Sequence, residues 1–351
     1  MIIPKIELLS VIVPTRGRSH KLLQLLNALE ALSTKTSCAF EVILVIDGDG
    51  DIPELNTSYP FQFIKSPHIG AGPARNLGIQ ASAGDAILFL NDDVVPQPGF
   101  LDAHVDALDL GNDAVLGDSP WIEQYKESVS DAATAFDGFI KYTPAIFNQY
   151  GLKENQKYDF RHGWTLNLSI RKSAIDQLET HFDPMLRPIY FEDIEFVYRC
   201  FGRLDQIIYC PAARATHDHR VTLTEYFSRE VLLGMMSVVL HDQNPECFHL
   251  LFPCPPEEHA RITSETMSLD ARDHSRILSR FMKLADTPMD MNNPTDQALM
   301  LFDIHLPIKR RAFRIGLSAM LDQNIHWTQR VSRSTELIKS DQVLQKLVSG
   351  T

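Results

Sequence analysis

Cysteine is scarce in this sequence, and long apolar runs are absent. The five cysteines form no CxxC pair and are odd in number: Cys38, Cys200, Cys210, Cys247 and Cys254. This pattern is typical of free, mostly buried thiols in a reducing cytosol. The longest late apolar run, VLLGMMSVVL, has about half of the roughly 20 residues that a membrane-spanning helix needs. Pro4 and Glu7 interrupt the amino-terminal stretch where a signal peptide would be apolar, so we expect a cytoplasmic protein without a transmembrane segment.

An excess of positive charge is also lacking. Lysine and arginine number 33 against 45 aspartates and glutamates, which gives a net charge of −12. This balance argues against nucleic acid or an anionic membrane as a non-specific partner, although a local basic pocket for phosphates remains open. With 351 residues, of which 44% are hydrophobic, the chain is long enough for about two domains.

The glycine-rich fingerprint of dinucleotide-binding folds is missing. The first predicted strand is followed by PTRGR, and the later glycine-rich string at 70–75 reads GAGPAR. A nicotinamide-dependent dehydrogenase needs GxGxxG directly after its first strand, so the sequence does not predict that class. The glycines permit close approach of the backbone, and Arg75 near a helix start is placed to serve a diphosphate.

Strands and helices alternate in the first half of the chain. Buried apolar runs predict strands at 10–14, 40–46, 61–65 and 85–90. Helical spacing of apolar residues begins at Ser19 and again within 69–84. This order predicts an α/β fold with a Rossmann-like, mostly parallel sheet that carries helices on both faces.

Polar residues follow three of these strands at their carboxyl ends. The three groups are PTRGR at 14–18, Asp47, and the triplet Asn91-Asp92-Asp93. A single aspartate in such a place is most often a cap or turn residue. Because the carboxyl ends of parallel strands meet at one edge, however, the three groups converge where open α/β sheets bind ligands. Carboxylate oxygens there suit a hard divalent cation that bridges them to phosphate.

In this order and spacing, PTRGR, Asp47, GPARNLG and FLNDD resemble a family 2 glycosyltransferase of the GT-A fold, over about residues 9–220. The resemblance implies a nucleotide-sugar donor, with a UDP-sugar expected, and a divalent metal, Mn²⁺ or Mg²⁺. It implies a donor site made of Pro14, Thr15, Arg16, Arg18, Asp47, Arg75, Asn91 and Asp92. In the family, residues matching Thr15 and Asp47 hold the nucleobase, and the one matching Arg75 lies near the diphosphate.

The metal ligands implied by the resemblance are Asp93, from the acidic triplet, with His217 and His219 from ATHDHR. Imidazole is common at divalent metal sites, although carboxylate suits Mn²⁺ better. A pair of surface histidines is the alternative. The chain departs from the family pattern at Asn91, where an Asp is usual, because Asn accepts a ribose hydrogen bond but brings no charge.

The segment RHGWTLNLSIRK predicts a half-buried strand over 164–170 and a helix capped by Ser173. In the family, a strand of this form contributes residues beside the donor sugar, which here are Trp164 and Asn167. The alternative is a core tryptophan and a structural asparagine.

Glu192 and Asp193 precede a predicted helix, where acidic residues are often only caps. The resemblance makes them the catalytic pair, with Asp193 as the general base and Glu192 orienting the acceptor or a loop. Inverting transfer needs a carboxylate that removes the proton from the attacking hydroxyl. We expect the helix N-terminus to hold the pKa of Asp193 low.

The rest of the chain is less informative. A strand is predicted at 113–119, and the aromatic-rich segment before residue 162 is a plausible acceptor-facing insertion. From residue 223 onward only helical spacing is seen, so we expect domains at 1–222 and 223–351. The helical domain is expected to bind the acceptor, to form a homodimer or to dock a partner.

The sequence therefore predicts a metal-assisted, inverting transfer of a sugar from a nucleotide-diphosphate sugar to an acceptor hydroxyl, as in polysaccharide biosynthesis. The acceptor class stays open among carbohydrate, lipid-linked and small molecules. A retaining GT-A glycosyltransferase without a general base is one alternative. A non-catalytic sugar-nucleotide-binding scaffold is the alternative from another class.

Overall fold

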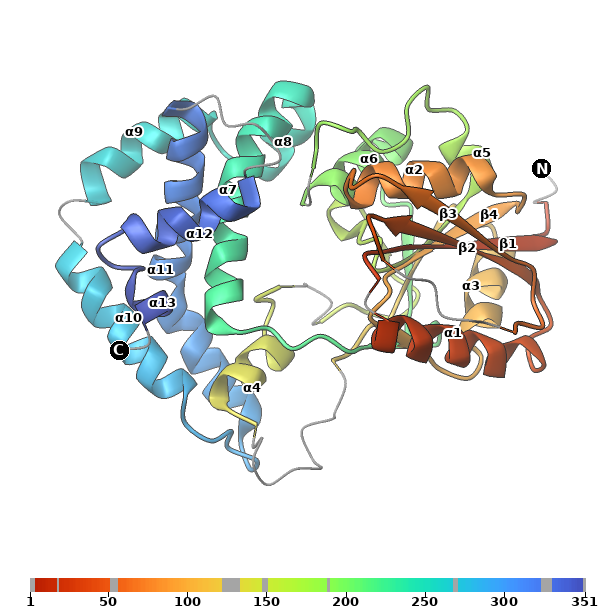
Figure 1. Ribbon diagram of the computed structural model, residues 1–351, viewed down its shortest axis with the longest axis horizontal. Coiled ribbons are helices and arrows are strands. Elements are labelled where there is room, and N and C mark those ends of the chain that lie inside the picture. The colour runs from red at the N-terminus through yellow and green to blue at the C-terminus, as the bar shows by residue number, and fades with distance from the viewer. Residues whose placement is uncertain are drawn as a thin grey trace. The chain divides into compact units, whose positions relative to one another are not determined.

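The computed structural model of the protein describes residues 4–17, 19–50, 56–121, 133–146, 151–187, 190–267, 271–322 and 330–349. The chain divides into two compact units (Figure 1). Residues 1–122 and 151–219 form the first, and residues 123–150 and 220–351 form the second. The segment 123–150 therefore groups with the helical residues, whereas the sequence placed it in a first domain ending at residue 222. Its helix α4 (Ala135–Tyr142) explains this, because buried Phe139 packs edge-on against Tyr226 and Phe281.

The first unit is built on a sheet of eight strands. Its strands, with two more that pair separately, are β1 (Leu8–Thr15), β2 (Ala39–Asp47), β3 (Phe61–Ser66), β4 (Ala86–Leu90), β5 (Val94–Pro96), β6 (Ala114–Gly117), β7 (Lys157–Tyr158), β8 (Asn167–Arg171), β9 (Ile207–Cys210) and β10 (Ala215–His217). The order is β3-β2-β1-β4-β8-β6-β9-β7, and β5 pairs with β10. The pairs β1–β2, β2–β3, β1–β4 and β6–β9 are parallel, whereas β4–β8, β6–β8 and β7–β9 are antiparallel. The mostly parallel α/β sheet predicted from the sequence is therefore confirmed.

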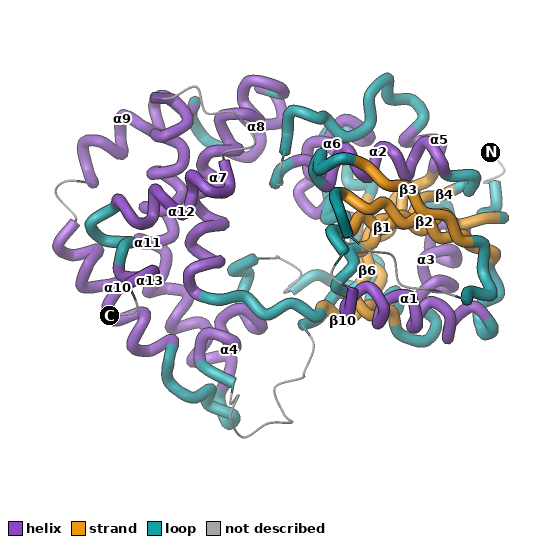
Figure 2. Tube along the Cα trace, in the orientation of Figure 1, coloured by secondary structure: helices purple, strands orange, loops and turns teal. Residues whose placement is uncertain are grey.

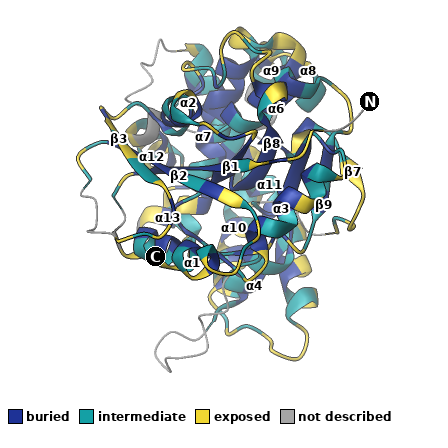
Figure 3. Ribbon diagram, turned by 90° about the vertical axis from the view of Figure 1, so that its right-hand side faces the viewer, coloured by how far each residue is buried: buried dark blue, intermediate teal, exposed yellow. Residues whose placement is uncertain are grey.

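The central strands form because their sequences are apolar on both faces. Val42–Ile46 of β2 and every residue of β4 are fully buried, as are Leu9 and Val11–Val13 of β1. Strands with both faces covered need such continuous apolar runs. The outer strand β3 is only partly buried, and Figure 3 shows the change from buried to exposed residues toward it.

Helices cover both faces of this sheet. They are α1 (Ser19–Ser33), α2 (Ala71–Ala81), α3 (Phe100–Asp109), α5 (Lys172–Ile175) and α6 (Glu192–Phe201), with a 3-10 turn at Phe160–His162. In Figure 1, α2, α5 and α6 lie on one side of the strands, and α1 and α3 lie on the other. Gly78 lets α2 approach β1 closely, since a Cβ atom there would lie 2.4 Å from Cγ2 of Ile12.

The described part of the second unit contains helices and no strand (Figure 2). Besides α4 they are α7 (Leu223–Gln243), α8 (Pro245–Leu251), α9 (Pro256–Met267), α10 (Ala271–Ala285), α11 (Pro294–Asp322), α12 (Arg330–Ser340) and α13 (Lys346–Ser349). Helices α7 and α11 touch at Gly234 and Gly316. A Cβ atom on either glycine would lie 1.8 Å from a carbonyl oxygen of the opposite helix. Among the residues described, no helix is both long and apolar enough to cross a membrane.

Candidate active site

The carboxyl ends of β1, β2 and β4 lie side by side at one edge of the sheet. In the parallel register, Thr15 of β1 pairs with Ile46, and Ile12 pairs with Phe89 of β4. Thr15 Oγ1 donates a hydrogen bond of 2.6 Å to Oδ2 of Asp92, and both residues are buried. The structure therefore joins the PTRGR segment, of which Pro14 is the buried penultimate residue of β1, to the acidic triplet. Arg18 lies outside the described residues.

Asp47 holds the loop that leads into α2. Its Oδ1 accepts a 2.6 Å hydrogen bond from the Ile69 backbone N–H, and its Oδ2 accepts one of 3.0 Å from the Gly70 N–H. Gly70 has a φ of 98°, a conformation that favours glycine. Arg16, half exposed, places its Nε 3.9 Å from Asp47 Oδ2. Asp47 thus fixes the glycine-rich loop at the same edge as Thr15.

Arg75 is buried, and its side chain links α2 to the start of α6 and to the residue after β4. Its Nη1 lies 3.3 Å from Oε1 of Glu192 at the start of α6, and its Nη2 donates to Oδ1 of Asn91 at 3.3 Å. The guanidinium carbon lies 5.6 Å from the centre of the Phe182 ring. Residue 91 is Asn, where the family pattern has Asp, so its contact with Arg75 is a hydrogen bond between a charged and a neutral group. Among the described contacts, Glu192 is the carboxylate that forms an ion pair with Arg75.

Asp93, His217 and His219 form a compact cluster. His217 Nε2 lies 3.5 Å from Asp93 Oδ1, and His219 Nδ1 lies 3.3 Å from Asp93 Oδ2. One ligand atom from each of the three lies within 4.8 Å of the others. The antiparallel pairing of β5 with β10 creates this arrangement, because it places His217 opposite Val94, next to Asp93. Within the described ranges this is the group of three that can hold a metal ion.

The cluster fits a divalent cation. An octahedral ion holds its ligand atoms about 2.1 Å away, so adjacent ligand atoms lie about 3 Å apart. The separations of 3.3 and 3.5 Å need only a small adjustment. A carboxylate with two imidazoles is a donor set that first-row divalent ions such as Mn²⁺ accept.

The two residues before α6 have an unusual backbone conformation. Tyr190 and Phe191 have φ of 83° and 65°, the left-handed region that L-residues seldom adopt. Phe191 is the N-cap residue and makes no side-chain cap. Asp193 lies within the first turn and accepts a hydrogen bond of 2.8 Å from the Ile194 N–H. Asp193 is therefore not the N-cap of this helix, although it does accept a first-turn N–H.

The electrostatics of the Glu192–Asp193 pair differ from the sequence prediction. Burial and the neighbouring Asp193 carboxylate raise the pKa of Glu192 to about 7, against the opposing effect of Arg75. Burial also raises the pKa of Asp193, although Arg75 and the backbone N–H groups of Ile194 and Thr165 lower it. The expectation that the helix N-terminus holds the pKa of Asp193 low is wrong, because desolvation outweighs it. Raised carboxyl pKa values bring proton acceptance closer to neutral pH.

Asn167 and Trp164 have different environments. Asn167 is fully buried, its Oδ1 lies 2.9 Å from Nε2 of His104, and its amide donates to the carbonyl oxygens of Asp118 and Ala213. Its amide ties β8 to α3 and to the loops after β6 and β9, as the alternative of a structural asparagine implies, and a place beside the donor sugar stays a prediction. Trp164 is largely buried in the turn before β8, next to Thr165, whose N–H interacts with Asp193.

Two residues that the sequence did not suggest also lie at this edge. The Trp121 ring stacks on His217, with centroids 4.6 Å apart and planes 25° apart. The Lys21 ammonium group donates to the carbonyl oxygen of Asp218. The only signal in the sequence was that Trp121 follows the predicted strand at 113–119.

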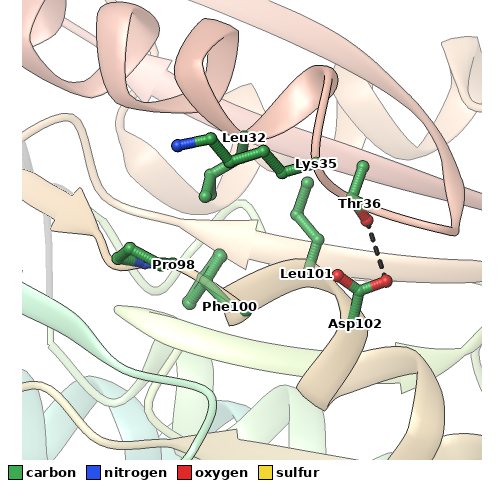
Figure 4. Close-up of a pocket in the computed structure, with 8 residues that line it drawn as sticks. Leu32, Lys35, Thr36, Pro98, Phe100, Leu101 and Asp102 are labelled. Atoms are coloured by element: carbon green, nitrogen blue, oxygen red, sulfur yellow. Dashed lines mark hydrogen bonds between the residues drawn. The ribbon is translucent and has the colours of Figure 1, made fainter.

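A small pocket elsewhere in the first unit contains none of the predicted site residues (Figure 4). It lies between the end of α1 and the start of α3. Leu32, Phe100 and Leu101 line it, and Asp102 closes one side by accepting a hydrogen bond from Thr36. We assign it no function.

A comparison with known protein families finds a match that covers much of the sheet and several residues at its carboxyl edge. The sequence model of Glycosyl transferase family 2 matches residues 10–178, which run from within β1 through α5 and contain Thr15, Asp47, Arg75 and Asp93. Residues 10–178 of this chain are therefore a family 2 glycosyltransferase region. The family that the resemblance implied is confirmed over these residues.

The individual relatives have either low sequence identity to this chain or a short region of overlap with it. An uncharacterized glycosyltransferase of Haemophilus influenzae is 39% identical over 89 residues, which cover 24% of this chain and 29% of that protein. The pre-mycofactocin glycosyltransferase of Mycobacterium tuberculosis is 24% identical over 249 residues, covering 68% and 48%. Among solved structures, S. aureus TarS 1-349 aligns over 98% of this chain and 92% of that one, with 14% identity and a TM-score of 0.46. The chain spans half or less of the length of these two curated relatives.

Proposed function

We propose that this protein transfers a sugar from a nucleotide-diphosphate sugar to an acceptor hydroxyl, with inversion at the anomeric carbon and with the assistance of a divalent metal. One observation carries the proposal. The carboxylate pair Glu192–Asp193 is joined through Arg75 to Asn91, two residues before Asp93 of the metal-binding cluster. A base and a cation site at one sheet edge are what inverting transfer requires.

The donor binds along the carboxyl edge of the sheet. Thr15 and Asp47 border the nucleobase, with Arg16 at the exposed side of Asp47. Asn91 and Asp92 follow β4 and serve the ribose and the sugar phosphate. Arg75 contributes less to the diphosphate than the sequence indicated, because it is 4% exposed and already pairs with Glu192. A UDP-sugar is the donor that we expect.

Asp93, His217 and His219 would hold the metal. A bound Mn²⁺ or Mg²⁺ neutralises charge that develops on the leaving diphosphate. Asp93 and His217 are both 4% exposed, so their attraction to a cation is only weakly screened by water. His219 is the more exposed ligand, with 38% of its side chain accessible.

Asp193 acts as the general base. It takes the proton of the acceptor hydroxyl while the hydroxyl oxygen attacks the anomeric carbon opposite the nucleotide diphosphate, whose bond to that carbon breaks. Its raised pKa makes it a better proton acceptor than a solvated aspartate. Glu192, held by Arg75, orients the start of α6 and hence Asp193.

Experiments can distinguish this function from two alternatives. A retaining enzyme shares this donor site and needs no base, and a non-catalytic scaffold binds the donor and turns nothing over. The placement of Asp193 and its raised pKa favour the inverting enzyme. The helical residues 223–351 are proposed to bind the acceptor, to dimerise or to dock a partner, and the acceptor can be a carbohydrate, a lipid-linked molecule or a small molecule.

The test begins with a thermal-shift screen of nucleoside diphosphates and nucleotide-sugars with Mn²⁺. The donor that stabilises the protein most is then incubated with it, and its hydrolysis or transfer is followed. NMR of the anomeric proton of the product distinguishes inversion from retention. Stabilisation by a donor without any turnover would favour the scaffold.

A further inference from the structure

Trp121 contacts the candidate metal site from a segment that carries none of its predicted ligands. Its ring lies 4.6 Å from that of His217, nearly parallel to it at 25°. The His217 and His219 rings are themselves 5.7 Å apart, with planes at 19°. Three aromatic rings thus have similar orientations, and two of them, those of His217 and His219, lie next to Asp93.

The backbone explains why Trp121 reaches this place. The Asp118 carbonyl accepts a hydrogen bond of 2.9 Å from the Ala215 N–H, and the Pro120 carbonyl accepts one of 2.8 Å from the His217 N–H. Residues 118–121 therefore run beside β10, and Trp121 forms a parallel bridge with His217. Neighbouring residues on adjacent strands have side chains about 5 Å apart, which places the indole over the imidazole.

We propose that Trp121 is a positioning residue, which holds the His217 imidazole with its Nε2 toward Asp93 and toward a divalent cation bound there. The proposal rests on the metal-assisted function proposed above. His217 Nε2 already lies 3.5 Å from Asp93 Oδ1, whereas rotation of the ring would move that nitrogen away. A flat ring packed on one face of the imidazole opposes such rotation and excludes water from that face.

The alternative is that Trp121 only fills space in the segment after β6. A leucine would then serve nearly as well, provided that the chain folds. The two readings differ in what the affinity for the metal should do, independently of any turnover.

The experiment measures Mn²⁺ binding by electron paramagnetic resonance in the full chain, in Trp121→Leu, in Trp121→Phe and in Asp93→Ala. Partners of metal ligands typically change metal affinity about 10–100-fold, so we expect Trp121→Leu to weaken Mn²⁺ binding about tenfold. Trp121→Phe keeps an aromatic ring on His217 and should bind Mn²⁺ nearly as the wild type does. Thermal unfolding without metal checks that each variant folds, and Trp121→Met replaces the leucine variant if that one does not.

Intrinsic fluorescence gives a second readout. Paramagnetic Mn²⁺ should quench tryptophan emission in the wild type, diamagnetic Mg²⁺ should not, and Trp121→Phe should lose most of the quench. Equal Mn²⁺ affinity in wild type and Trp121→Leu would overturn the positioning role and leave the proposed function intact. Equal weakening in the leucine and phenylalanine variants would also overturn it. A wild type that binds Mn²⁺ no better than Asp93→Ala would instead overturn the metal site itself.

Discussion

Arg75 and Glu192, 117 residues apart in the chain, form an ion pair in which each side chain is only 5% exposed. Their nearest charged atoms are 3.3 Å apart. A buried carboxylate beside a second carboxylate, Asp193, would be costly to ionise without this partner. The pair therefore connects the glycine-rich entry into α2 with the start of α6.

The free energy of unfolding should depend on pH through Glu192. Its pKa is raised from 4.5 to about 7 in the folded state, so between these pH values the folded protein binds more protons than the unfolded chain. Stability contributed by Glu192 is therefore present below pH 4.5 and is lost as the pH rises through 7. We expect wild type to lose about 1–3 kcal/mol more than Glu192→Gln between pH 5 and pH 8.

Urea unfolding of both proteins at the two pH values measures this difference. Asp176→Asn, which changes an exposed carboxylate of the same unit, is the matched control and should keep the wild-type dependence. Identical pH dependence of wild type and Glu192→Gln would show that Glu192 is ionised normally.

Replacing Asp193 by Asn should separate catalysis from structure. The change removes the proton acceptor, and general-base catalysis is worth about 10²–10⁴-fold, so turnover should fall by that order. Donor affinity should stay nearly constant because the proposed nucleotide contacts, such as Thr15 and Asp47, do not include Asp193. The free energy of unfolding should change by about 1 kcal/mol or less, since Asn can still accept the Ile194 N–H.

Steady-state kinetics with separate donor titrations give kcat and Kd for that comparison. A variant with near-native kcat would favour the retaining mechanism. A variant with lost donor binding would mean that Asp193 belongs to the donor site.

Gly316→Ala should destabilise the helical unit. The added methyl group would lie 1.8 Å from the Val231 carbonyl oxygen, so α7 and α11 must separate. Overpacking of this kind costs about 1–3 kcal/mol or more. Denaturant unfolding should show this loss, and Ser318→Ala on the same helix should stay within about 0.5 kcal/mol of wild type. Equal stability of the two variants would mean that the helices can shift apart without loss.

The sequence was sufficient for the sheet and the convergence of its polar ends, but not for the partners of individual charges. β1, β2 and β4 were predictable because continuous apolar runs have few other uses in a soluble fold. The ion pair of Arg75 with Glu192 depends on how α2 and α6 meet in space. The contact of Asn167 with His104 of α3 could not be predicted either, because a strand pattern does not tell which helix packs on it.

The helical segments were also predictable, whereas the grouping of residues 123–150 with them was not. No local pattern around Phe139 shows that it packs on Tyr226 and Phe281, which lie far along the chain. Trp121 was missed for the same reason. Its relation to His217 arises only when the chain after β6 runs beside β10.

The most direct test of the account is calorimetric titration of the protein with UDP, and with other nucleoside diphosphates in turn, in Mn²⁺ and in EDTA. Our account predicts that a nucleoside diphosphate binds in Mn²⁺, that EDTA weakens this binding strongly, and that Asp93→Ala loses the Mn²⁺-dependent part while Asp176→Asn keeps it. Binding of equal strength with and without the metal, or in wild type and Asp93→Ala, would contradict it.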